Sequence, residues 1–128
     1  MTKREPIPIS ERRRYPRVEE YLRIEVAKGH EQIVTKTVNL SCGGTLCWLE
    51  HPLPLMTKVV VSLALPTRLV HCRGVVVRCE SVRAAAERLR GQYRVALFFT
   101  ELARRDHRAI AEFVLESMFA PAHGYRRP

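Results

Sequence analysis

Hydrophobic and polar residues alternate in several stretches of the chain, which is the pattern of β-strands with one buried face. The first such stretch is Tyr21–Ala27, where Leu22, Ile24 and Val26 share a face. Residues 33–38 follow after a short turn and are rich in β-branched side chains. Four more segments of this kind lie at residues 45–49, 59–65, 69–79 and 92–99.

After Thr100 the spacing of apolar residues changes to that of an amphipathic helix. Ile110, Val114 and Met118 form an apolar stripe with Phe113 beside it, and charged residues occupy the opposite face. Six short strands followed by one helix predict a mainly β fold. We expect a small antiparallel six-stranded β-barrel with a C-terminal α-helix.

Several residues interrupt the regular pattern. Residues 39–44 should break one strand and start the next, and Gly74 should mark a bulge in a long strand. Trp48 is expected to be a core residue rather than a platform for stacking a base. Residues 81–90 contain good helix formers and could be a helical turn or a mobile insertion between two paired strands, to which the sequence assigns no role.

The length of 128 residues suits one domain with a single modest core. We expect a flexible lead-in at residues 1–10, the barrel domain at 11–119 and a frayed tail at 120–128.

The net charge of +9 favours an anionic partner such as a nucleotide, a nucleic acid or an acidic membrane. Positive charge is densest before residue 18, where Pro16 disfavours a helix. In an extended segment, Arg13 and Arg17 would point to the same side and could clamp phosphates and stack on a base. The alternative is a solvated basic tail, as charge runs commonly are.

A second polar stretch combines an amide, a hydroxyl and two glycines. Asn39 and Ser41 carry groups that can hydrogen-bond to the edge of a base, and Gly43 and Gly44 would let the backbone approach a ligand. The alternative is a simple tight turn, because these residue types are all common turn formers.

Taken together, the two stretches resemble the PilZ family of cyclic di-GMP receptors. The family pattern is R-x-x-x-R followed, after two strands, by [DN]-x-S-x-x-G, and residues 13–17 and 39–44 match both parts. The resemblance extends over about residues 11–119. It implies that the arginine pair binds phosphate and the Hoogsteen edge of guanine, and that the polar turn contacts a guanine. The expected ligand-binding residues are Arg12, Arg13, Arg14, Arg17, Asn39, Ser41, Gly43 and Gly44, of which Arg12 and Arg14 have no fixed role in the family.

The resemblance implies a bacterial receptor for cyclic di-GMP. We expect its N-terminal arm to change conformation when the ligand binds, because the like charges of its arginines repel one another in the free protein. The receptor would then signal to an unidentified partner protein that acts in motility, adhesion or polysaccharide output. Two alternatives stay open: an adaptor of the same fold that binds no nucleotide, and a basic nucleic-acid-binding module. Against the last, aromatic residues, which form the stacking platforms of such modules, make up only 7% of the chain.

Other classes of function find little support in the sequence. The five histidines are dispersed without an evident nucleophile or carboxylate pair, so we expect no enzyme. The four cysteines form no C-x-x-C pair, so we expect no metal site and no cofactor other than the ligand. No apolar run reaches the ~20 residues of a membrane span and no secretory signal is evident, which predicts a cytoplasmic protein. A homo-oligomer formed through the helix stays open.

Overall fold

The computed structural model of the chain describes residues 17–82 and 92–119. Its elements are β1 (Arg17–Val18), β2 (Arg23–Lys28), β3 (Glu31–Ser41), β4 (Gly44–Leu49), β5 (Lys58–Ala64), β6 (Leu69–Val82), β7 (Gln92–Glu101) and α2 (Arg104–Phe119). The predicted lead-in at 1–10, the predicted tail at 120–128 and most of the predicted insertion lie outside the described residues. The first two residues of that insertion, Ser81 and Val82, continue β6 instead.

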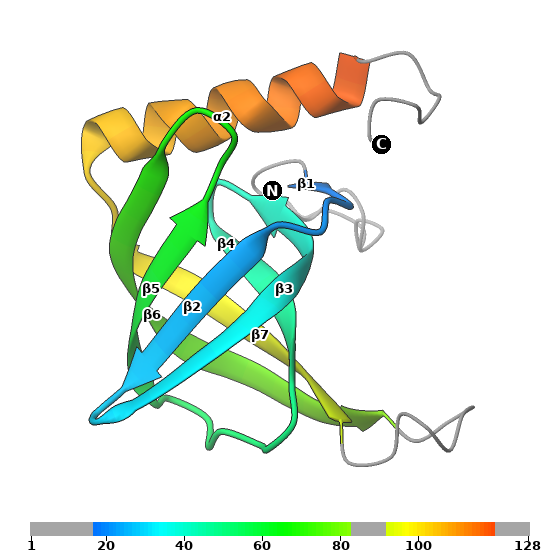
Figure 1. Cartoon of the computed structure of the whole chain (residues 1–128), viewed down its shortest axis with the longest axis vertical. Helices are drawn as coiled ribbons and strands as arrows, with labels where there is room; N and C mark the ends of the chain where they lie inside the picture. Colours follow the sequence, from blue (N-terminus) through cyan, green and yellow to red (C-terminus); the bar gives the residue numbers. More distant parts are fainter. Residues whose placement is uncertain (1–16, 83–91, 120–128) are drawn as a thin grey trace, which may run out of the picture.

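The strands form one antiparallel sheet that closes on itself. Its order is β1-β3-β2-β5-β6-β7-β4, and β4 pairs back with β3, so six strands make a closed ring. This confirms the predicted six-stranded barrel with a C-terminal helix. The two-residue β1 is an addition that pairs with β3 (Figure 1). Closure leaves few strand edges free to pair with other chains.

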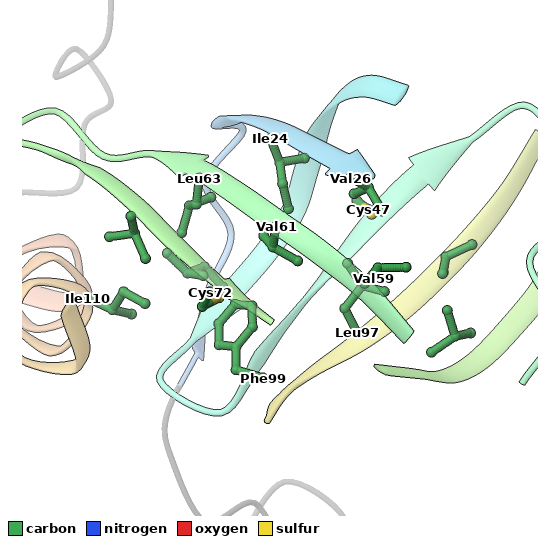
Figure 2. Close-up of a cluster of buried hydrophobic side chains, with 14 of the residues drawn as sticks. Ile24, Val26, Cys47, Val59, Val61, Leu63, Cys72, Leu97, Phe99 and Ile110 are labelled. Carbon is green, nitrogen blue, oxygen red and sulfur yellow. The ribbon is translucent and has the colours of Figure 1, made fainter. Parts of the chain in front are cut away.

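The core fills the inside of the barrel with one face of each of its six strands. Ile24, Val61 and Leu63 are fully buried there and belong to one hydrophobic cluster with Cys72 and Phe99 (Figure 2). The alternation in the sequence arises because successive side chains of a strand point to opposite sides of the sheet.

Helix α2 lies across one end of the barrel (Figure 1) and buries Ile110 and Val114. Asp106 in its first turn is also buried, and its Oδ1 lies 3.1 Å from Nη2 of Arg68, in the β5–β6 connection. An acidic side chain in this position also interacts favourably with the positive end of the helix dipole. The ion pair therefore fastens the start of the helix to the barrel.

The expectation that Met118 continues the buried stripe is wrong, since this side chain is 46% exposed. Asp106, Ile110 and Val114 are spaced by four residues, whereas a helix turn takes about 3.6. Each step of four therefore rotates the side chain by roughly 40°, and the third step carries Met118 away from the barrel.

Register shifts mark three irregular places in the barrel. One residue is extra in β3 at Val38, one in β6 at Val77 and one in β7 at Thr100. The bulge predicted at Gly74 is thus adjacent to Gly74, but the extra residue belongs to the partner strand β7. A Cβ on Gly74 would lie 2.9 Å from the Phe98 carbonyl oxygen, so the missing side chain permits close strand contact.

Two further expectations need correction. The strand break predicted at residues 39–44 is much shorter, because β3 continues through Ser41 and only Cys42 and Gly43 separate it from β4. The prediction of Trp48 as a core residue is also wrong. Cys47 and Leu49 point into the barrel, so Trp48 between them points outward and lines a surface groove of about 340 Å³.

Candidate ligand-binding site

The pairing of β1 with β3 brings the two polar stretches of the sequence together. Arg17 is directly opposite Ser41 in this pairing, and Val18 is opposite Leu40. Residues opposite one another on antiparallel strands have Cα atoms about 4.5–5.5 Å apart. The last arginine of the basic stretch therefore lies beside the polar turn.

The spacing of the polar turn follows from the alternation of β3. Leu40 is fully buried and Cys42 is 9% exposed, so both point into the barrel. Asn39, Ser41 and Gly43 alternate with them and consequently lie on the outer side. A ligand on that side would meet the amide, the hydroxyl and the glycine together.

The hydroxyl of Ser41 helps to form the turn. Its Oγ accepts a hydrogen bond from the backbone N–H of Gly43 at 3.1 Å and donates to the carbonyl oxygen of Gly44 at 3.4 Å. The N–H of Phe99 also donates to the carbonyl oxygen of Gly43 at 2.9 Å, which ties the turn to β7. The long Ser41–Gly44 bond is weak, so the hydroxyl proton is available to a better acceptor.

Asn39 has a fixed backbone and a free side chain. Oγ1 of Thr45 donates to the carbonyl oxygen of Asn39 at 2.6 Å, which holds the strand in place next to the bulge. Within the described part of the chain, no hydrogen bond to the Asn39 side-chain amide is found. The amide can therefore offer both a donor and an acceptor to a ligand.

Gly44 is required by the packing of the barrel itself. A Cβ at this position would collide with the carbonyl oxygen of Leu97, where β4 passes close to β7. The expected part of Gly44 in admitting a ligand stays a prediction, but its backbone role is independent of any ligand.

Thr37 positions β1 and was not singled out from the sequence. This fully buried residue accepts a hydrogen bond at Oγ1 from the Leu22 N–H at 2.9 Å and donates from the same hydroxyl to the Glu20 carbonyl oxygen at 2.5 Å. Its own N–H donates to the carbonyl oxygen of Leu22 at 2.8 Å. These bonds fix the connection between β1 and β2. In the sequence Thr37 is one of several β-branched residues of a predicted strand, so its type alone did not point to this role.

One surface groove of about 400 Å³ collects Arg17, Asn39, Ser41, Gly43 and Gly44. The expected residues Arg12, Arg13 and Arg14 lie outside the described residues. The remaining lining comes from β4, β6 and β7 and was not predicted as part of a site. It consists of Thr45, Leu46, Val77, Arg78, Ala96, Leu97 and Phe98.

The charge of this groove suits an anion. Its described lining contains two arginines and neither a carboxylate nor a histidine. The apolar residues and Phe98 add a surface on which a flat ring could stack. The groove therefore fits a ligand that combines phosphate with aromatic bases.

Other kinds of site are not found among residues 17–82 and 92–119. No cluster of three histidine, cysteine or acidic residues could hold a metal ion there. The buried thiols there are poor nucleophiles, since loss of hydration raises the pKa of Cys47 to about 12 and that of Cys72 to about 11. Within the same ranges, no helix has the length and apolar character needed to cross a membrane.

The chain matches a known domain family over most of its length. The family model of the PilZ domain matches residues 11–116. A comparison with curated proteins finds no match.

Solved structures of similar fold include the Bacillus subtilis inhibitor of motility MotI/DgrA, with a TM-score of 0.76 and 20% identity over 87% of this chain and 53% of MotI. The PilZ domain of Escherichia coli YcgR with c-di-GMP has a TM-score of 0.65 and 14% identity over 82% of this chain and 90% of that one. The K. pneumonia MrkH–c-di-GMP complex has a TM-score of 0.68 and 18% identity over 83% of this chain and 52% of MrkH. The chain thus spans about half the length of MotI and of MrkH, and at these identities the likeness concerns the fold.

Proposed function

Because the chain belongs to the PilZ domain family, we propose that it is a receptor for cyclic di-GMP. The observation that carries the proposal is the groove in which Arg17 meets Asn39 and Ser41. The YcgR and MrkH structures, which share its fold, were solved with c-di-GMP. A cyclic dinucleotide has the two properties that the groove suits, namely anionic phosphates and flat hydrogen-bonding bases.

Each residue of the proposed site has a defined task. Arg17 contacts a phosphate and the Hoogsteen edge of a guanine, where its planar guanidinium can donate two parallel hydrogen bonds. Asn39 and Ser41 bind the edge of the same base. Arg13 completes the clamp, while Arg12 and Arg14 add positive charge that favours the approach of the ligand.

The proposed receptor is not an enzyme. The described lining of the groove holds no histidine or carboxylate to act as a general base for Ser41. A receptor without catalysis passes on its signal through a change in its surface. We propose that the changed surface contacts a separate cytoplasmic protein.

The proposed change in that surface involves the N-terminal arm. Four arginines at positions 12, 13, 14 and 17 repel one another, and an anionic ligand bound among them removes that repulsion. The arm would then close over the outer face of the barrel. Hydrogen exchange tests this step, because amides in residues 8–20 should exchange markedly more slowly after cyclic di-GMP is added. Unchanged exchange there would remove the conformational step while leaving the binding site in place.

Calorimetric titration tests the proposed ligand directly. Wild-type protein should bind cyclic di-GMP saturably with micromolar or better affinity, and should bind neither GMP nor a single-stranded oligonucleotide comparably. Arg17→Ala should weaken binding by about 1.5–3 kcal/mol, the range for hydrogen bonds to charged groups. Arg23→Ala is the matched control, because Arg23 is an exposed arginine on β2 that does not line the groove.

The other outcomes separate the competing functions. Binding to the oligonucleotide alone, with a steep dependence on salt, would indicate a nucleic-acid-binding module. No binding to any of the three ligands would indicate an adaptor that works without a nucleotide. If Arg17→Ala and Arg23→Ala lost the same affinity for cyclic di-GMP, overall charge rather than this groove would attract the ligand.

A further inference from the structure

The bulge in β6 turns two successive side chains toward the outer face of the barrel. Val76 is fully buried, and strict alternation would expose Val77 and bury residue 78. Instead, Val76 pairs with Leu97 and Arg78 pairs with Ala96, which leaves Val77 as the extra residue. Val77 and Arg78 are both exposed as a result, and both line the groove that contains Arg17.

The floor of the groove next to these residues is apolar and open. Ala96 of β7 lies between Leu46 of β4 and Arg78 of β6 in the cross-strand register. Phe98, the next outward residue on β7, lies opposite Gly44, which has no side chain to cover a neighbouring ring. The Phe98 side chain is correspondingly 51% exposed. An accessible ring beside small residues is a suitable surface for stacking a base.

Arg78 brings a positive charge to this side of the groove, in addition to that of Arg17. Its Nε lies 3.9 Å from Oε2 of Glu80, and both side chains are about half exposed. An exposed ion pair of this length contributes little to stability, so it leaves the guanidinium available to an anionic ligand. Strands β4, β7 and β6 are successive neighbours (Figure 1), so Arg78 is two strand spacings, about 10 Å, from β4.

We infer that Arg78 and Phe98 form a second half-site, which binds the other half of a dinucleotide. The inference rests on the proposed function. Arg17 and the polar turn hold one phosphate and one guanine, while Phe98 stacks on the second base and Arg78 pairs with the second phosphate. A mononucleotide can occupy only one of the two half-sites. The second half-site therefore sets the preference for a dinucleotide.

The test compares two ligands, cyclic di-GMP and 5′-GMP, by titration of the full chain. Arg78→Ala and Phe98→Ala should each lower the affinity for cyclic di-GMP by about tenfold or more, as expected for a charged contact or a stacked base. Both substitutions should change the weak affinity of the polar turn for GMP by no more than about twofold. The ratio of the affinity for cyclic di-GMP to the affinity for GMP should therefore fall. Arg73→Ala is the matched control, because Arg73 is an exposed, ion-paired arginine on the same strand that does not line this groove.

The results separate this inference from the proposed function. Wild-type protein that binds no cyclic di-GMP contradicts both. Wild-type protein that binds cyclic di-GMP, together with Arg78→Ala and Phe98→Ala affinities equal to that of Arg73→Ala, overturns the second half-site alone. Arg78→Gln keeps a polar, hydrogen-bonding side chain without the positive charge and should lose as much affinity as Arg78→Ala. Full affinity in Arg78→Gln would contradict the phosphate contact.

Discussion

At the scale of single residues, the polar turn is constrained by the backbone as well as by any ligand. Ser41 accepts the Gly43 N–H, and Gly43 in turn accepts the Phe99 N–H, so these two residues connect β3 to β7. Gly44 leaves room for the carbonyl of Leu97. The turn thus has its shape before a ligand arrives, which lowers the entropic cost of binding.

The substitution Gly44→Ala tests the backbone role of this glycine. The new Cβ would collide with backbone rather than with a flexible side chain, so β4 and β7 must separate. We expect the free energy of unfolding in urea to fall by about 1–3 kcal/mol, the usual cost of overpacking. A variant as stable as wild type would show that the strands separate without cost, and the glycine would then be explained by the ligand alone.

The buried thiol of Cys47 predicts a dependence of stability on pH. Burial raises its pKa from 9.0 to about 12, so the folded chain holds a proton that the unfolded chain releases above pH 9. Its contribution is therefore fully present below pH 9 and is lost as the pH rises from 9 to about 12. Over that interval, Cys47→Ala should lessen the fall in unfolding free energy by about 1.4 kcal/mol per pH unit. If wild type and Cys47→Ala showed the same dependence of unfolding free energy on pH, a raised pKa of Cys47 would be contradicted.

At the scale of elements, the position of β1 depends on Thr37. The connection from β1 to β2 is held by hydrogen bonds to this buried side chain and to its N–H. The same strand lines the groove two and four residues later, at Asn39 and Ser41. The location of Arg17 is therefore coupled to a residue inside the barrel.

Thr37→Val should lower both stability and ligand affinity. It preserves the shape but removes the hydroxyl that bonds to the Leu22 N–H and to the Glu20 carbonyl oxygen, at a cost of about 1–3 kcal/mol. Affinity should fall because β1 loses its anchor. Thr35→Val is the control, being the same change two residues earlier at a position that is only half-buried. Equal effects of the two substitutions on both measurements would contradict the anchoring role.

At the scale of the whole molecule, the sequence predicts the elements better than their neighbours. The alternation located all six barrel strands, because each strand has one buried face, and the helical spacing of apolar residues located the helix. The alternation missed β1, because two residues are too few to show a period. Trp48 was expected in the core for a different reason, namely that a large aromatic side chain suggested burial. The short break after Ser41 was also not evident, because asparagine and serine are common turn formers that here continue a strand.

The same limit applies to the candidate site. Its near side could be predicted, because Arg17, Asn39 and Ser41 belong to two short motifs. The far side could not, because Arg78 and Phe98 reach the groove only through the order β4-β7-β6 and the bulge at Val77. Such pairing between distant segments leaves no local pattern in the sequence.

Backbone amide chemical shifts recorded during titration with cyclic di-GMP test the central claim most directly. The largest changes should fall on the outer face around the polar turn and its neighbouring strand, at Ser41, Gly43, Gly44 and Phe98. The groove beside Trp48, on another part of the barrel surface, provides the internal control. We predict small changes there. Large shifts at Trp48 and Gln92 with none around the turn would contradict the proposed site.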